Sequence, residues 1–151
     1  MKRLGAFLIA LFVCFCSLSV FAANPQIIYS GDSGNASDLI VVRRPESKNS
    51  ATIKTTYGII GTGRYGINVS YYQYNGSYYT SIAQTTIGSA GVFYKQVSLS
   101  EGHNKFAVRA ESASGTYQVV YFDINLLNQE IMNNVTTFAG GIQSLYNGWM
   151  N

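Results

Sequence analysis

Tyrosine side chains are the densest concentration of chemically capable groups in this 151-residue sequence. Five of the 12 tyrosines flank a single Asn-Gly pair in residues 68–82, "NVSYYQYNGSYYTSI". A phenol ring presents a flat apolar face beside a hydroxyl group, so tyrosines with neighbouring Asn and Ser can stack on sugar rings or on another protein. Tyrosine also favours β-strands and pairs across them. We therefore interpret the cluster first as part of a sheet and second as a binding surface.

The Asn75-Gly76 pair predicts how this segment folds. Asn-Gly is a typical two-residue loop of a β-hairpin, because both residues tolerate the positive φ angles of a type I′ turn. Such a loop sets Tyr72 opposite Tyr79, and alternation then separates two faces. The predicted core face holds Ile67, Val69, Tyr71, Tyr78, Thr80 and Ile82. The other face is predicted to be exposed, and together with the loop it supplies the candidate binding residues Tyr72, Tyr74, Asn75 and Tyr79.

Residues that commonly carry catalysis or bind metals are few. The one histidine, His103, lies in a predicted turn at 101–104, and both cysteines, Cys14 and Cys16, lie in an apolar N-terminal run. A metal site needs several histidine, cysteine or carboxylate ligands together. No serine stands in a G-x-S-x-G context, and no pattern pairs two carboxylates for glycoside cleavage. We therefore expect no enzyme activity, catalytic residue, metal site or cofactor.

The N-terminus has the organisation of a secretory signal peptide. Two basic residues follow Met1, an apolar run spans 4–20, and small residues precede a cleavage point after Ala22. We predict that residues 1–22 are removed and that the protein is secreted, to the extracellular space, the cell surface or the periplasm. The alternative is a membrane anchor, but the run is short for a membrane span and no basic cluster follows it. We therefore expect no stable membrane anchor.

Loss of this segment changes the charge balance. Two of the 10 basic residues lie in it, whereas all 7 acidic residues lie beyond it, so the secreted part is nearly neutral. The one local basic pair, Arg43-Arg44, is interpreted as the solvated end of a strand. Nucleic-acid binding requires clustered Lys and Arg. We therefore expect no nucleic-acid partner.

The rest of the sequence has a strand pattern. Residues 23–37 are rich in Ser, Gly, Asn and Asp and are predicted to be a flexible leader. Beyond them, short β-branched and aromatic runs alternate with turn residues. The predicted strands are 39–42, 52–60, 67–74, 77–82, 92–99, 105–111 and 117–124, with a break at Gly61-Thr62-Gly63. About seven short strands without an intervening helix indicate an all-β antiparallel sandwich or barrel over residues 38–125.

Two stretches of this region, "YGIIGTGRYGINVSYY" and "TTIGSAGVFYKQVSLSEGHNKFAVRAESASG", share a characteristic spacing of glycines and apolar residues. The spaced residues are Ile60, Gly61, Gly63, Gly66, Val69, Gly91, Phe93, Leu99, Glu101, Gly102, Asn104 and Ala110. In this the chain resembles the bacterial immunoglobulin-like domains of exported and cell-surface proteins. The resemblance implies an immunoglobulin-like antiparallel β-sandwich used for spacing, display or binding, without a conserved active site.

The C-terminal segment, 126–151, has a helical pattern. Apolar residues recur at spacings of three and four, which places them on one face of a helix. They are Leu127, Ile131, Val135, Phe138, Ile142, Leu145 and Trp149. Asn125 or Asn128 can cap the start, whereas Gly140-Gly141 disfavours a continuous helix, so two short helices are an alternative. The segment has no Lys or Arg, which argues against binding to a membrane surface.

Two interpretations of this apolar face stay open. In one, the helix packs back on the sandwich or covers a sheet edge. In the other, it is an interface for a second copy or for another exported protein. The leading functional prediction is an exported, non-enzymatic immunoglobulin-like module that acts in protein–protein interaction or cell-surface structure. The competing prediction is a carbohydrate-binding module that takes cell-wall or extracellular glycan on the tyrosine face.

Overall fold

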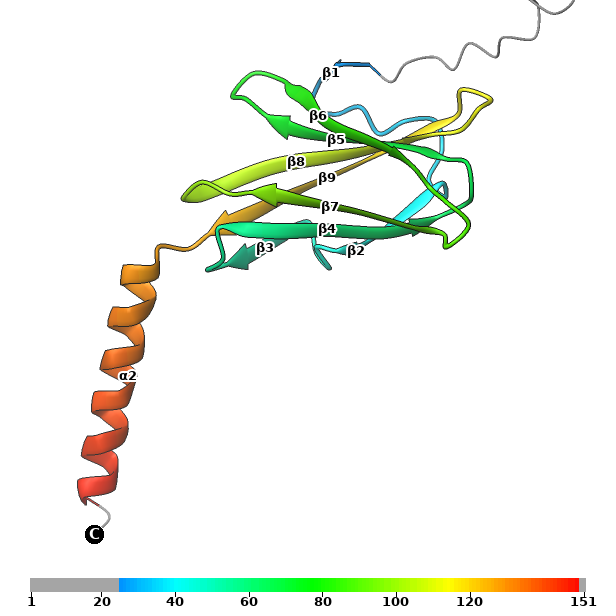
Figure 1. The fold of residues 1–151 in the computed structure, drawn as a ribbon. Coiled ribbons are helices and arrows are strands. Elements are labelled where there is room, and N and C mark those ends of the chain that lie inside the picture. Colours follow the sequence, from blue (N-terminus) through cyan, green and yellow to red (C-terminus); the bar gives the residue numbers. More distant parts are fainter. Residues whose placement is uncertain (1–24, 150–151) are drawn as a thin grey trace, which may run out of the picture.

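The computed structural model describes residues 25–149, which form two facing β-sheets and a C-terminal helix (Figure 1). The predicted signal peptide, 1–22, lies outside the described residues. The strands are β1 (Ile27–Ile28), β2 (Ile40–Arg44), β3 (Asn49–Thr52), β4 (Thr56–Gly63), β5 (Asn68–Tyr74), β6 (Tyr79–Thr86), β7 (Val92–Ser98), β8 (Gly102–Glu111) and β9 (Tyr117–Leu126). The helix is α2 (Gln129–Trp149). A mostly β, sandwich-like fold with a helical tail is therefore confirmed.

The two sheets differ in size. The larger has the strand order β1-β6-β5-β8-β9-β3, and the smaller has the order β2-β4-β7. Neighbouring strands are antiparallel except β3 and β9, which run parallel. The described part of the chain has nine strands where about seven are predicted, and the two extra ones are the short β1 and β3.

The main hydrophobic core lies between the sheets. Successive side chains of a strand leave opposite faces, so every second residue of β4, β5, β7 and β8 points inward. Val69 and Phe106 from the larger sheet and Ile59 from the smaller are fully enclosed. The rings of Tyr71 and Phe93 meet edge to face across the core, with centroids 6.3 Å apart. The alternation in the sequence therefore directs the correct side chains inward in these strands.

Gly61 and Gly63 lie inside β4, so the predicted break at these glycines is wrong. Their missing side chains make room for neighbours. A Cβ atom on Gly61 would lie 2.1 Å from Cζ of Phe93, and one on Gly63 would lie 2.6 Å from Cδ1 of Ile87. Because both distances are far below van der Waals contact, the glycines are required for packing. β4 continues through Gly61 to its end at Gly63 and pairs with β2 on one side and β7 on the other.

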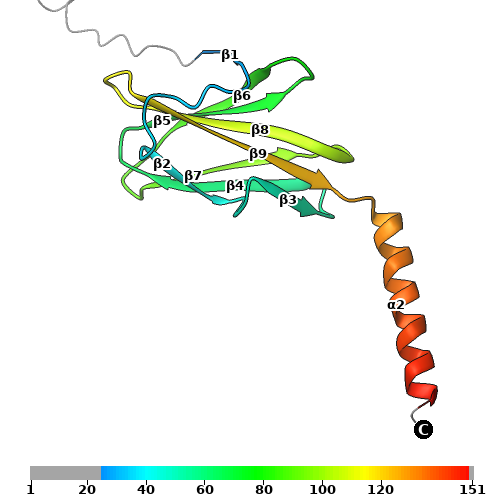
Figure 2. The ribbon, with the colours of Figure 1, turned by 180° about the vertical axis from the view of Figure 1, so that it is seen from behind.

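The helix α2 leaves the end of the sandwich after a short linker at Leu127 and Asn128, and it extends away from both sheets (Figure 2). The Oδ1 atom of Asn128 accepts a hydrogen bond from the backbone N–H of Glu130 at 2.8 Å, which confirms Asn128 as a helix cap. The helix runs without interruption through Gly140-Gly141, so the alternative of two short helices is wrong. The tail also begins later than predicted, because β9 includes Leu126.

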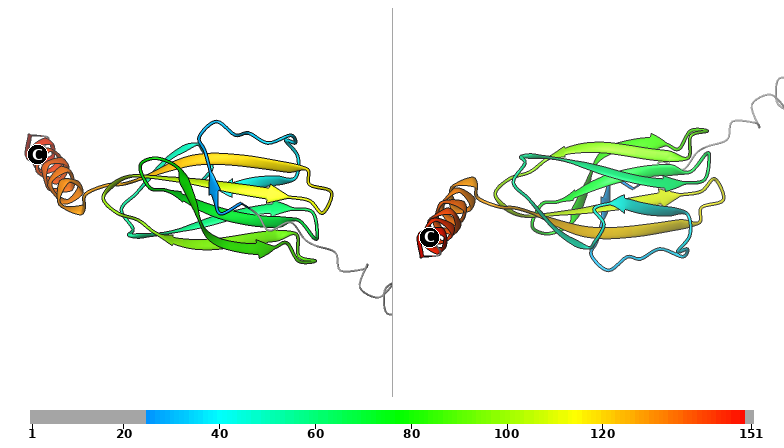
Figure 3. Two further views of the ribbon diagram at one scale, coloured as in Figure 1. Left: turned by 90° about the horizontal axis from the view of Figure 1, so that it is seen from above. Right: turned by 90° about the horizontal axis from the view of Figure 1, so that it is seen from below.

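In views from above and from below, α2 lies apart from the sandwich (Figure 3). The interpretation in which the helix packs back on the sandwich is therefore wrong. Among the residues that the structure describes, no helix combines the length and apolarity that a membrane crossing requires.

Candidate functional site

The hairpin of β5 and β6 closes through a longer loop than predicted. Tyr74 pairs with Tyr79 at the ends of the strands, which leaves residues 75–78 in the loop. The Oδ1 atom of Asn75 accepts hydrogen bonds from the backbone N–H groups of Ser77 and Tyr78, each at 3.1 Å. Asn75 thus closes the turn with its side chain. It has no positive φ, which a type I′ turn would demand of it, so the predicted two-residue loop is wrong.

The longer loop shifts the strand register by two residues. Tyr72 pairs with Ser81, where the two-residue loop would have set it opposite Tyr79. A shift of two keeps every side chain on its face, whereas a shift of one would reverse the faces. Tyr72, Tyr74 and Tyr79 therefore still share one face of the sheet, and they form a continuous cluster.

A β-bulge follows in β6. Tyr72 pairs with Ser81 but Tyr71 pairs with Ala83, so Ile82 is the extra residue of the bulge. Its side chain is 39% exposed, and the predicted core position of Ile82 is wrong. Tyr78 and Thr80, also predicted for the core, are only half-buried, because they lie at or beside the open loop of the hairpin.

The tyrosine face is buried. Tyr72 and Tyr79 are 0% and 6% exposed, and Tyr74 is half-buried beside them. With Ile28, Ala107 and Val119 they form a second hydrophobic cluster on the outer face of the larger sheet. The prediction of an exposed tyrosine platform is therefore wrong. Its cause lies in residues 25–37, which cover this face.

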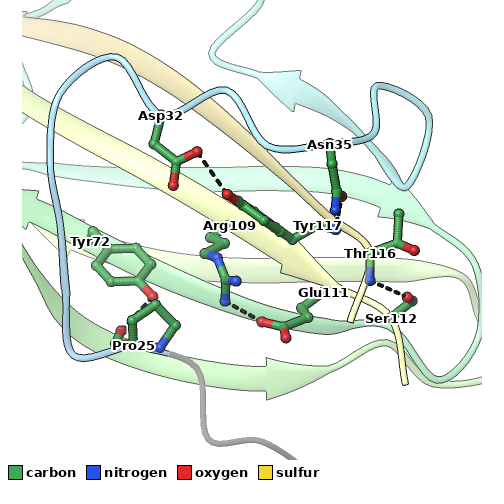
Figure 4. Close-up of polar contacts among 9 residues, drawn as sticks. All are labelled: Pro25, Asp32, Asn35, Tyr72, Arg109, Glu111, Ser112, Thr116 and Tyr117. Atoms are coloured by element: carbon green, nitrogen blue, oxygen red, sulfur yellow. Dashed lines mark hydrogen bonds and ion pairs between the residues drawn. The ribbon is translucent and has the colours of Figure 1, made fainter. Parts of the chain in front are cut away.

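We call residues 25–37 the strap, because they cross the outer face of the larger sheet (Figure 4). The strap begins as β1, which pairs with β6 and buries Ile28. The Oη atom of Tyr72 donates a hydrogen bond to the carbonyl oxygen of Pro25 at 2.7 Å, and Oη of Tyr121 donates to that of Tyr29 at 2.9 Å. The strap is thus an ordered layer of the fold, and the prediction of a flexible leader is wrong for these residues.

Tyr117 holds the other end of the strap. Its carbonyl oxygen accepts hydrogen bonds from the N–H groups of Asn35 and Ala36 at 2.9 and 3.0 Å, and its own N–H donates to Oδ1 of Asn35 at 2.8 Å. Its Oη donates to Oδ1 of Asp32 at 3.2 Å. Gly34 fits here because a Cβ atom would lie 2.3 Å from the same carbonyl oxygen, and because its φ is +83°.

Arg109 is enclosed beneath the strap (Figure 4). Its guanidinium carbon lies 4.4 Å from the centroid of the Tyr117 ring, and the group forms an ion pair with Glu111. The alternation in β8 predicts an exposed Arg109, because it cannot show that another segment covers this face. A charge withdrawn from water needs close partners, and here it receives a carboxylate and an aromatic ring.

The tyrosine hydroxyls of this region serve as hydrogen-bond donors. Burial raises the pKa of Tyr121 to about 12, and the Asp32 carboxylate adds to the shift. Burial likewise raises the pKa of Tyr72. Both hydroxyls are therefore protonated at neutral pH, and each donates a hydrogen bond to a carbonyl group of the strap. This arrangement holds the strap in place.

An open pocket of about 350 Å³ lies beside the strap, where Tyr79 pairs with Ile28. Its lining residues are Lys48, Asn49, Tyr79, Lys105, Tyr121, Phe122 and Asp123. The rings of Tyr79 and Tyr121 meet edge to face with centroids 5.1 Å apart. Nζ of Lys105 lies 5.5 Å from the centroid of the Tyr74 ring. Tyr79 is the one predicted binding residue among those that line this pocket.

His103 lies next to this pocket through its contact with Asp123. It belongs to the start of β8 rather than to a turn, and the Nδ1 atom of its exposed side chain lies 2.9 Å from Oδ2 of Asp123. The buried Oδ1 of Asp123 has no hydrogen-bond partner among residues 25–149. Within the same residues, no three His, Cys, Asp or Glu side chains gather as a set of metal ligands.

The apolar stripe of α2, defined here as Val135, Phe138, Ile142, Leu145 and Trp149, is uncovered. Every one of these side chains is more than half exposed, from 53% for Ile142 to 90% for Trp149. The side chain of Ile131 lies outside the described residues. Leu127 belongs instead to the linker, where its N–H donates to the carbonyl oxygen of Thr52 at 2.8 Å and continues the pairing of β3 with β9.

No protein-family model matches this chain, and no curated protein matches it. The resemblance to bacterial immunoglobulin-like domains therefore rests on the spacing of glycines and apolar residues in the sequence.

Proposed function

We propose that this protein is an exported, non-enzymatic immunoglobulin-like module that binds another protein through the apolar stripe of α2. The observation that carries the proposal is the exposure of five large apolar side chains on one face of a helix that stands clear of both sheets. Contiguous apolar patches of this kind on soluble proteins typically mark interaction sites. The sandwich is then the rigid body that displays the helix.

The immunoglobulin-like assignment has two supports. Two facing, mostly antiparallel sheets occupy the residues over which the resemblance extends, 38–125. Two of the glycines that carry the resemblance, Gly61 and Gly63, also have a packing role, since their missing side chains admit Phe93 and Ile87. A shared fold would keep glycine at positions where the packing leaves no room for a side chain.

The chemistry of the stripe favours a protein partner over a lipid surface or a glycan. Residues 124–151 contain no Lys or Arg that could attract anionic lipid. The stripe residues are two aromatic and three aliphatic side chains, and among them only the indole N–H of Trp149 can donate a hydrogen bond. Sugar recognition requires several such polar groups beside the rings. A second apolar protein surface matches the stripe better.

The test compares two substitutions that add the same charge to α2. Ile142→Glu places a carboxylate in the stripe, whereas Ser144→Glu places one on another side of the same helical turn. Both chains are exported from the natural host and cross-linked on intact cells, and the products are separated by mass. We expect cross-linked species with the natural chain and with Ser144→Glu, and their loss with Ile142→Glu. Equal cross-linking of both variants would refute an interface at the stripe.

The pocket beside the strap supports a second candidate function, the binding of an acidic glycan. It combines aromatic rings, which stack on sugar faces, with two ammonium groups, those of Lys48 and Lys105, which attract carboxylates or sulfates. This site replaces the exposed platform that the sequence predicts at Tyr72, Tyr74 and Tyr79. Only Tyr79 belongs to both.

Calorimetric titration with sulfated and uronic-acid oligosaccharides tests this candidate. Lys105→Ala is expected to weaken binding by roughly tenfold, the effect of losing one charge-assisted hydrogen bond of about 1.5 kcal/mol. Lys54→Ala, a change of the same type at an exposed residue that does not line the pocket, serves as the control. If no acidic oligosaccharide binds the natural chain at millimolar concentration, the glycan candidate is excluded.

A further inference from the structure

The stripe of α2 follows the spacing of a coiled coil. From Ile131 through Val135, Phe138, Ile142 and Leu145 to Trp149, the intervals are 4, 3, 4, 3 and 4 residues. Strict alternation of three and four is the heptad pattern, in which two positions of every seven form a narrow seam. Met132, Ala139 and Tyr146 follow at the next position of each heptad and widen the apolar face on one side of the seam. The strict intervals of the seam fit packing of one helix against another.

We infer that the protein bound by α2 is a second copy of this chain, and that the two helices join in a two-stranded coiled coil. The inference rests on the function proposed above for the stripe and names its partner. In the heptad, Val135, Ile142 and Trp149 take the a positions, and Phe138 and Leu145 take the d positions. β-Branched residues at a with Leu at d favour two strands, and this chain has Val and Ile at a and Leu at one d position.

The surface of α2 already carries a hole of the kind that a coiled coil fills. An open apolar depression is lined by Ile142, Leu145, Tyr146 and Trp149. These residues stand at i, i+3, i+4 and i+7, which are the four positions that surround the hole for a seam side chain of a facing helix. A Leu145 side chain from a second copy has the size and chemistry to occupy it.

The charge pattern permits a copy to bind itself. Charged residues beside the seam normally select partners by attraction or repulsion. In α2 the only charged residue is Glu130, at the start of the helix, and the flanking positions hold neutral residues, Ala139, Gly141 and Tyr146 among them. Two identical helices therefore bring no like charges together along the seam. Ala139 and Gly141 are also small, which allows the helix backbones to approach closely at these positions.

The exposed area is sufficient for a stable dimer. Phe138 and Trp149 are 70% and 90% exposed. Aromatic side chains bury about 150–250 Å² each, so these two residues supply roughly 600–1,000 Å² when both copies are counted. If the stripe is fully covered, its three aliphatic residues bring the total to about 1,200 Å², the lower bound for specific stable interfaces.

Sedimentation equilibrium of the purified full-length secreted chain tests the inference. Three chains are compared from 1 to 200 µM: the natural one, Ile142→Glu and Ser144→Glu. We expect the natural chain and Ser144→Glu to show twice the monomer mass at the upper concentrations. Ile142→Glu is expected to weaken the dimer at least about 30-fold, as loss of a central interface residue does. Circular dichroism in the strand region checks that every variant retains its sandwich.

A natural chain that sediments as a monomer throughout, or as a trimer, would overturn the two-stranded self-association, as would equal dissociation constants for Ile142→Glu and Ser144→Glu. The cell-surface cross-linking described above separates the two proposals. If the purified chain is monomeric but Ile142→Glu still abolishes a cross-link to a protein of different mass, α2 remains an interface with another partner. If neither experiment responds to Ile142→Glu, both proposals fail.

Discussion

The phenol oxygen of Tyr72 lies 2.7 Å from the carbonyl oxygen of Pro25, a residue 47 positions earlier in the chain. This hydrogen bond joins the strap to the centre of the larger sheet. It also turns a tyrosine that the sequence places on an exposed face into a fully buried one. We therefore expect the strap to contribute measurably to the free energy of unfolding.

Replacement of Tyr72 by Phe tests that contribution. The ring stays in place but the hydrogen bond to Pro25 is lost, so the free energy of unfolding should fall by about 1 kcal/mol. Urea denaturation gives this value, and hydrogen exchange at the N–H of Ser81, which donates to Gln26 in the strap, should become faster. Tyr94→Phe, at an exposed ring, is the control and should change stability by less than about 0.5 kcal/mol. Unaltered exchange at Ser81 would argue against a strap held by Tyr72.

A substitution at Gly34 should loosen the other end of the strap. In Gly34→Ala the new Cβ meets the carbonyl oxygen of Tyr117, and the φ of +83° is unfavourable for alanine. Gly31→Ala is the matched control, because Gly31 also has a positive φ but nothing within 4 Å of its Cβ position. The control should cost about 1–2 kcal/mol from φ alone, and Gly34→Ala should cost clearly more in the same urea titration. Equal losses would show that the contact with Tyr117 is absent in solution.

Tyr71→Phe should stabilise the protein at neutral pH. The hydroxyl of Tyr71 is buried in the main core without a hydrogen-bond partner among the described residues. Removing an unsatisfied buried polar group recovers its desolvation cost, so the free energy of unfolding should rise by about 1 kcal/mol. Chemical denaturation at pH 7 measures the change. A decrease would mean that the hydroxyl is hydrogen-bonded in solution.

The same residue predicts a loss of stability in alkali. Burial raises the pKa of Tyr71 from 10.0 to about 12 in the folded protein. The unfolded chain therefore releases this proton at a lower pH than the folded chain. As a result, the free energy of unfolding keeps its full value below pH 10 and falls as the pH rises from 10 to 12. The loss amounts to about 2–3 kcal/mol at the upper end. Burial of Tyr121 acts in the same direction. Stability curves of the natural chain and Tyr71→Phe should diverge above pH 10, because only the natural chain carries this hydroxyl, whereas parallel curves would contradict the shift.

Export can be checked on the protein itself. The apolar run at 4–20 and the small residues before position 23 predict cleavage after Ala22. Mass spectrometry of protein recovered outside the cytoplasm should give a chain that begins at Ala23. Recovery of a chain that retains residues 1–22 in the membrane fraction would instead support the alternative of an N-terminal anchor.

Local patterns in the sequence were sufficient for much of the architecture. Alternation at Phe106, Val108 and Ala110 predicts a half-buried strand, and these residues face the core in β8. The stripe in α2 follows from residue spacing, and Asn128 caps the helix as predicted. These features depend on residues within one or two turns or strands of each other, so the sequence contains the information directly. The error in the predicted hairpin loop also has a local cause, because the side chain of Asn75 accepts backbone hydrogen bonds that stabilise a different turn.

The strap could not be predicted in the same way. Its one sequence signal is the apolar trio Ile27-Ile28-Tyr29 within a polar segment, and this trio does not indicate which surface it covers. The alternation of side chains in β5 and β8 places Tyr72 and Arg109 on the face that is predicted to be exposed. Both are buried, because a segment remote in sequence lies over them.

The sequence by itself determined most of the strands, the helix, and the apolar side of most of these elements, because these properties repeat with the period of the backbone. Only the tertiary structure decided which apolar surfaces meet. It covered the tyrosine face with residues 25–37 and left the stripe of α2 open, since the outer face of the larger sheet was already occupied and the linker directs the helix away from both sheets. Contacts between distant segments depend on the free energy of the whole packed fold, which no local period expresses.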